Sequence, residues 1–123
     1  MNVANLELCR ELHELSGWED TYLAYVSQTT GEQHVLAADG SFGENWDFDW
    51  AYDLSYLLRK LPVHTKLWAE RPDNWHAHFD DKDGLMQGLH VTYDTPEDAA
   101  AKLCVELIKQ GLLTPKNERT ESV

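Results

Sequence analysis

The chain is poor in several residue types, and each scarcity narrows the protein classes to which it can belong. Two cysteines in 123 residues exclude a disulfide-rich scaffold and a four-cysteine zinc site. No apolar run reaches the length that spans a bilayer. Residues 1–10 do not combine a basic start with an apolar stretch, as a secretory signal does. We therefore expect a cytoplasmic protein that does not act on membranes.

Basic residues are also scarce. The chain has 22 acidic residues and 10 basic ones, a net charge of -12, and no Lys or Arg lies between Glu11 and Leu58. Direct nucleic-acid binding is not expected, because phosphate contacts require Lys and Arg. An acidic field would attract a basic partner surface, although acids also simply keep a small protein soluble.

Catalytic sequence templates are also missing. The chain has no phosphate-binding loop, no dinucleotide-binding glycine pattern, no Gly-x-Ser-x-Gly and no His-Glu-x-x-His. The acidic stretch around Asp80 fails as a calcium loop, because His90 stands where the last carboxylate is required. Cys9 and Cys104 fall on apolar helical stripes, which favours buried side chains over reactive thiols. The sequence therefore favours a protein that is not an enzyme.

Periodicity predicts an α+β fold. Asp49 is expected to cap the second helix, and Thr95 and Pro96 to begin the last one. The order is helix, two strands, helix, three strands, helix, which suggests an antiparallel sheet of four to five strands with helices on one face. One domain is expected over residues 1–114, followed by a polar tail over residues 115–123. The expected helices cover residues 3–15, 50–61 and 95–110, and the expected strands cover residues 21–27, 33–38, 63–69, 75–79 and 89–93.

Histidines form the first candidate site. His76 and His78 alternate on one predicted strand, so both point to one face, and His90 has the same parity on the next strand. Three imidazoles on one face could hold zinc or another borderline transition metal, with a carboxylate such as Asp80 nearby. The alternative is that this is the ordinary polar face of an antiparallel sheet. His64 shares the parity on a third strand.

Aromatic residues form the second candidate site. They alternate with acids near the middle of the chain, which is typical of a protein-binding surface. The same rings could instead pack as core, with Asp49 capping a helix. The candidate interface residues are Trp46, Asp47, Phe48, Asp49 and Trp50.

Three blocks of the sequence belong together: residues 51–62, the stretch from Thr95 to Leu113, and the short segment Glu14–Trp18. They resemble blocks of small hypothetical proteins from tailed phages and prophages. The blocks build a fold and hold no chemistry, and that family has no assigned activity. The resemblance implies a phage-encoded protein in a bacterial host cytoplasm.

Three functions remain open from the sequence. The first is a non-enzymatic phage accessory protein that binds a host or phage protein, where its acidic surface could occupy a nucleic-acid-binding site. The second is a small metal-binding domain or metal-dependent enzyme that uses His76, His78 and His90. The third is a virion or assembly component that associates through the sheet face carrying Trp68 and these histidines.

Overall fold

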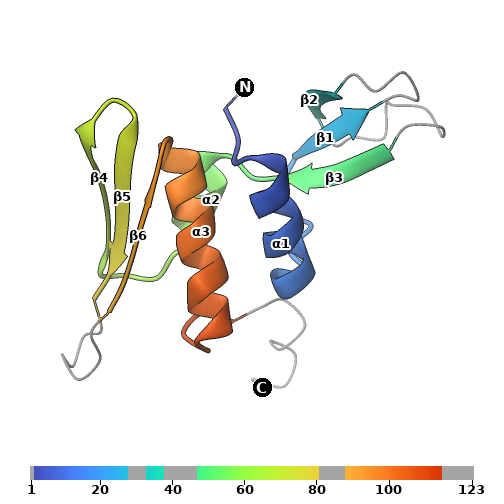
Figure 1. The fold of residues 1–123 in the computed structure, drawn as a ribbon. Coiled ribbons are helices and arrows are strands. Elements are labelled where there is room, and N and C mark those ends of the chain that lie inside the picture. Colours follow the sequence, from blue (N-terminus) through green and yellow to red (C-terminus); the bar gives the residue numbers. More distant parts are fainter. Residues whose placement is uncertain (1, 28–32, 38–46, 81–87, 115–123) are drawn as a thin grey trace.

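The fold consists of three helices and two separate antiparallel sheets (Figure 1). It is seen in a computed structural model that describes residues 2–27, 33–37, 47–80 and 88–114. The α+β class is confirmed, but the single sheet predicted from the sequence is wrong. In chain order the elements are α1 (Leu6–Ser16), β1 (Leu23–Ser27), β2 (Gln33–Ala37), β3 (Asp47–Ala51), α2 (Leu54–Lys60), β4 (Thr65–Arg71), β5 (Asn74–Phe79), β6 (Leu89–Tyr93) and α3 (Pro96–Lys109).

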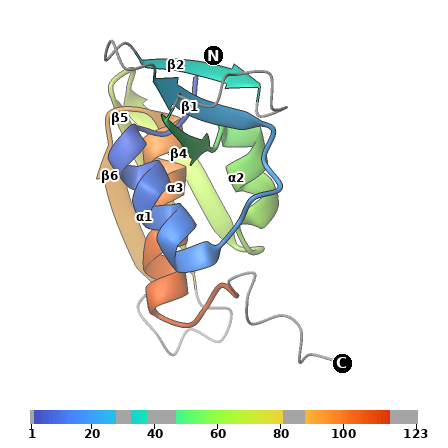
Figure 2. The same cartoon turned by 90° about the vertical axis from the view of Figure 1, so that its right-hand side faces the viewer.

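Helix α3 lies between the two sheets, and it begins with the N-cap that the sequence predicts. The Thr95 side chain accepts a hydrogen bond from the Asp98 N–H at 3.1 Å, and Pro96 follows in the first turn. The Asp98 carboxylate accepts from the Asn5 N–H at 2.7 Å. Asn5 is itself the N-cap of α1. The starts of α1 and α3 are therefore joined, near the first sheet (Figure 2).

The first sheet has the strand order β2-β1-β3. Its third strand, β3, was not predicted, because Trp50 and the leucines that follow it have helical spacing. The helix instead begins after Asp53, whose side chain accepts from the Tyr56 N–H at 2.9 Å. Asp49 is therefore not the cap of α2. It lies in β3, and Arg10 of α1 forms an ion pair with it at 3.0 Å.

The second sheet has the strand order β4-β5-β6 and packs one face on α3. Alternation along β5 buries Ala77 and Phe79 against Leu103 and Leu107 of α3. The opposite face of β5 carries His76 and His78. This face is turned away from the helices, as Figure 1 shows.

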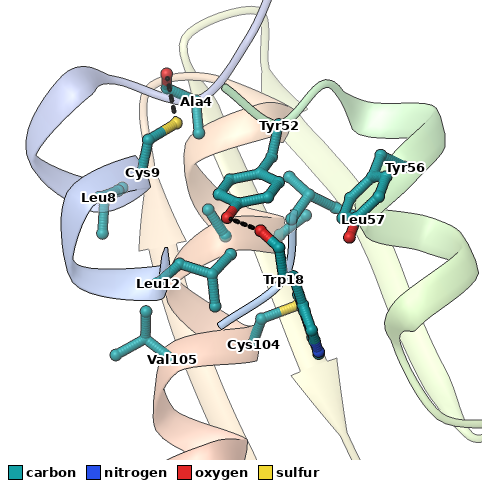
Figure 3. Packing of buried hydrophobic residues seen from close by; sticks show 12 residues of the cluster. Ala4, Leu8, Cys9, Leu12, Trp18, Tyr52, Tyr56, Leu57, Cys104 and Val105 are labelled. Atoms are coloured by element: carbon teal, nitrogen blue, oxygen red, sulfur yellow. Dashed lines mark hydrogen bonds between the residues drawn. The ribbon is translucent and has the colours of Figure 1, made fainter. Parts of the chain in front are cut away.

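The core has two parts, one on each side of α3. The first part joins α1, α2 and α3, and its aromatic members are anchored by hydrogen bonds (Figure 3). The Tyr52 hydroxyl donates to the Trp18 carbonyl at 2.7 Å, and the Cys9 thiol lies 3.3 Å from the Ala4 carbonyl. None of the described helices is long and apolar enough to span a membrane.

Candidate functional site

The candidate site is a cluster of three imidazoles on the outer face of the β4–β5–β6 sheet. His78 and His90 are direct partners across β5 and β6, and His76 lies two residues before His78 on the same face. The structure thus brings together the three histidines that the sequence places on one face. We call His76, His78 and His90 the imidazole cluster.

His90 lies between the other two rings. Its Nε2 atom is 2.9 Å from Nδ1 of His76, and its Nδ1 atom is 3.2 Å from Nδ1 of His78. The Thr92 hydroxyl lies 3.5 Å from Nδ1 of His76, at the limit of a hydrogen bond. Each outer ring therefore faces a different nitrogen of His90.

A carboxylate holds the far side of each outer ring. Nε2 of His76 lies 2.6 Å from the Glu70 carboxylate, and Nε2 of His78 lies 2.6 Å from the Asp80 carboxylate. The result is a continuous chain of contacts in the order Glu70, His76, His90, His78, Asp80. The side chains of His76 and His78 are only 15% and 24% exposed, whereas the central His90 and the two carboxylates are exposed to solvent.

Trp68 covers one end of the imidazole cluster. Its ring stacks on His76 with centroids 5.0 Å apart and planes 8° apart, and it meets His90 edge-on at 5.6 Å. Trp68 is the cross-strand partner of His76 and is itself 40% exposed. This contact restricts the rotation of the His76 ring and places an indole beside the site.

The surroundings shift the pKa of two groups in the cluster. Partial desolvation lowers the pKa of His90, and the charges of His76 and His78 lower it further. The hydrogen bond from His78 lowers the pKa of the Asp80 carboxyl. Both shifts favour a neutral His90 and an ionised Asp80 near pH 7. Neutral imidazole is the form that binds metals.

Glu70 is a site residue that the sequence analysis missed. The predicted strand ended at Ala69, whereas β4 continues to Arg71 and its pairing with β5 is irregular between these two residues. The alternation of Lys66 and Trp68, extended by one step, would have placed Glu70 on the histidine face. His64 precedes β4 with a positive φ of 71°, and its carbonyl accepts from the Asp80 N–H at 3.2 Å.

The three imidazoles do not converge on one point. Within the described ranges, no three His, Cys, Asp or Glu side chains form a group that could hold a metal ion. In the imidazole cluster this follows from His90, which presents one nitrogen to His76 and the other to His78. The predicted metal site therefore remains a prediction, and any metal must bind a smaller set of these nitrogens or a rearranged one.

The structure describes only part of the predicted interface segment. Trp46 and the side chain of Asp47 lie outside the described part of the chain. Trp50 is half-buried and packs against the core, and its ring meets Phe48 edge-on at 5.1 Å. Phe48 is 41% exposed, whereas Asp49 is paired with Arg10. Of the described side chains in this segment, Phe48 is the most exposed aromatic surface.

The two cysteines are buried, as the sequence predicts. Cys9 and Cys104 are both fully inaccessible, and burial raises the pKa of each thiol to about 12. Neither thiol is therefore ionised near pH 7, which does not suit a nucleophile.

Neither family models nor curated proteins nor solved structures give a significant match to this chain.

Proposed function

We propose that the protein binds a divalent transition-metal ion at the imidazole cluster. The observation that supports this most directly is the pairing of each outer ring with a carboxylate through Nε2. Metal-binding histidines commonly hold their second nitrogen in this way, because the carboxylate fixes the ring and makes the ligating nitrogen more basic. Imidazole donors favour zinc, copper or nickel over calcium or magnesium.

The arrangement also brings the ring nitrogens of the three histidines close to one another. Carboxylates on the outside leave Nδ1 of His76 and Nδ1 of His78 facing His90 at 2.9 and 3.2 Å. At such distances one cation can contact two of these nitrogens once both are unprotonated.

Metal binding can be tested by calorimetric titration of untagged protein with zinc, and by metal analysis of protein purified without chelators. We expect one site per chain in the wild type, and loss of that site in His90→Ala. His13→Ala is the matched control, because His13 also contacts a carboxylate, Glu19 at 2.9 Å, but lies on α1. A wild type that binds no zinc, nickel or copper would refute the proposal.

A second candidate function is binding of a partner protein through the first sheet. Leu36 and Phe48 flank β1 on one face of this sheet and are 36% and 41% exposed, and Trp50 lies beside Phe48. Arg10 of α1 pairs with Asp49, whose side chain alternates to the opposite face. With a net charge of -12, we expect a partner whose contact surface is basic around an apolar centre.

This candidate is tested by a pull-down from bacterial lysate at several salt concentrations, with and without nuclease. Phe48→Ser should remove a stoichiometric partner, while the control Trp68→Ser on the other sheet should keep it. Retention of the partner by Phe48→Ser would refute this surface.

The resemblance of the helical blocks to phage proteins suggests where both candidate functions would operate. We propose a phage or prophage accessory protein that acts in the cytoplasm of a bacterial host. An alternative is an assembly component that associates through Trp68 and the imidazole cluster, and a monomer in solution would count against it.

A further inference from the structure

We propose that the protein forms a two-fold symmetric dimer in which β4 pairs antiparallel with β4 of a second copy of the chain. β4 is an edge strand with unpaired backbone groups, and its outer face carries a charge pattern that is complementary to itself. Dimerisation in this way does not depend on metal binding at the imidazole cluster.

The free side of β4 has backbone groups that can bind another strand. β4 is the outer strand of its sheet, at the margin of the molecule (Figure 1). The His64 carbonyl accepts from the Asp80 N–H, so every second residue from His64 onward directs its backbone groups to β5. The backbone groups of Leu67 and Ala69 therefore point away from β5, and within the described ranges nothing bonds to them. Such an edge is a template for pairing with a further strand.

The side chains on the outer face of β4 complement a second copy of themselves. Lys66 and Trp68 are cross-strand partners of His78 and His76, and Glu70 lies 2.6 Å from His76, so all three share this face. When Trp68 lies opposite Trp68 of the partner subunit, Lys66 lies opposite Glu70 of the partner subunit, and the reverse pair forms by symmetry. Opposed charges and opposed aromatic rings both stabilise a strand pair. One short stretch thus supplies both sides of the interface, as a two-fold axis requires.

The three side chains are accessible for these contacts. Lys66 is exposed, and in the described part of the chain its ammonium forms no ion pair. Glu70 contacts His76 and Asn74 through Oε1, so its Oε2 can accept from a further partner, and its side chain is 61% exposed. Trp68 is 40% exposed although one side of its ring stacks on His76.

The charges distinguish this register from its neighbours. Because Leu67 and Ala69 carry the outward backbone groups, strand pairing can shift only in steps that keep these groups opposed. The nearest shifts place Trp68 opposite Lys66 or opposite Glu70, and the next ones place like charges opposite each other, which is unfavourable. A lysine on an edge strand usually deters pairing. Here one register converts that lysine into an attractive contact.

Charge reversal tests the interface by sedimentation velocity over a range of protein concentrations. Lys66→Glu and Glu70→Lys should each weaken dimerisation by about tenfold or more, because two pairs in one dimer change from attraction to repulsion. An equimolar mixture of the two variants should form a mixed dimer with about the wild-type affinity, since every charge then faces its opposite. Arg59→Glu on α2 makes the same change in net charge as Lys66→Glu and should leave the dimer unchanged.

A cysteine at the two-fold axis tests the register directly. Opposed residues between the ladder hydrogen bonds have Cα atoms about 4.5 Å apart, a distance that a disulfide spans. Trp68→Cys should therefore give a covalent dimer on mild oxidation. Ala69→Cys should not, because Ala69 lies opposite Leu67 of the partner subunit. The native Cys9 and Cys104 are buried and do not compete.

The inference is overturned by a wild type that stays monomeric at the highest soluble concentration, or by a dimer that both charge variants retain. A disulfide in Ala69→Cys but not in Trp68→Cys would also overturn it. Circular dichroism identifies a charge variant that fails to fold, and the cross-link then decides, because Trp68→Cys keeps both charges. All measurements use metal-free protein, so their outcome is separate from that of the zinc titration.

Discussion

Tyr56, Asp20 and Lys60 form a small network at the edge of the first part of the core. Tyr56 is 2% exposed, and its hydroxyl donates to the Asp20 carboxylate. The Lys60 ammonium lies 3.3 Å from the same carboxylate and 5.0 Å from the centre of the Trp18 ring. The hydrogen bond from Tyr56 lowers the pKa of Asp20, and the charge of Lys60 lowers it further.

The lowered pKa of Asp20 predicts a pH-dependent contribution to stability. A carboxyl whose folded pKa is depressed stabilises the fold above its unfolded pKa, and that contribution is lost as the pH falls through the folded pKa. We expect Asp20→Asn to lower the free energy of unfolding by about 1 kcal/mol at pH 7, because the buried hydroxyl loses a charged acceptor. Urea unfolding of both proteins between about pH 2 and pH 7 measures this.

The difference between wild type and Asp20→Asn should shrink as the pH falls below about 4, the ordinary range for Asp. Protonated Asp20 is neutral, as Asn is. Asp73→Asn, in the exposed turn between β4 and β5, is the control and should change little at any pH. A difference that is constant with pH would contradict the role assigned to the charge.

At the scale of elements, Gly88 and Gly111 are two of the glycines that have positive φ angles at the ends of secondary structure. Gly88 precedes β6 with φ 73°, and Gly111 follows α3 with φ 77°. A Cβ at Gly88 would lie 2.4 Å from the Phe79 carbonyl oxygen at the end of β5, whereas a Cβ at Gly111 would meet nothing within 4 Å. A residue with a Cβ would be strained by the backbone conformation at both positions, but only at Gly88 would its Cβ also clash with a neighbour.

We expect the substitution of alanine for glycine to destabilise the fold unequally at these two positions. Gly111→Ala should lower the free energy of unfolding by about 1–2 kcal/mol, which is the cost of the left-handed conformation for a residue with a Cβ. Gly88→Ala should cost more, because the β5–β6 connection must also move away from Phe79. Denaturant unfolding compares the two variants, and equal costs would show that the backbone at Gly88 relaxes freely.

The elements that the sequence predicted well are those with local signals. The start of α3 follows from Thr95 and Pro96, and β6 from strict alternation between Leu89 and Tyr93. β3 was missed because Trp50 and the leucines after it have helical spacing, and only the pairing of β3 with β1 shows that Trp50 lies in a strand. Strand pairing is a tertiary property, so local periodicity cannot settle it.

The candidate site shows the same difference between local signals and tertiary contacts. Alternation placed His76, His78 and His90 on one face, and the structure brings their rings into contact. Glu70 was missed because the predicted strand ended at Ala69, whereas β4 continues past the irregular pairing at its end. The sequence thus predicted the rings but not the carboxylate that orients one of them.

At the scale of the whole molecule, α3 connects two parts of the core that lie on its opposite sides. Ala99, Leu103 and Leu107 pack with the second sheet, while Cys104 and Val105 pack with α1 and α2. All five are fully buried. Loss of packing on one side of α3 should therefore weaken the other side, because one helix supports both.

We therefore expect the molecule to unfold as one unit. Leu103→Ala removes packing from the second part of the core, and we expect it to lower the free energy of unfolding by about 2–5 kcal/mol. Hydrogen exchange measured by NMR should show the same loss of protection at amides of β1 as at amides of β5. Val105→Ala, on the other side of α3, is the matched variant and should also lower protection in both sheets equally. A loss confined to β5 in Leu103→Ala would mean that the second sheet opens while the first sheet and α1 stay folded, and the imidazole cluster would then lie on a separately unfolding unit.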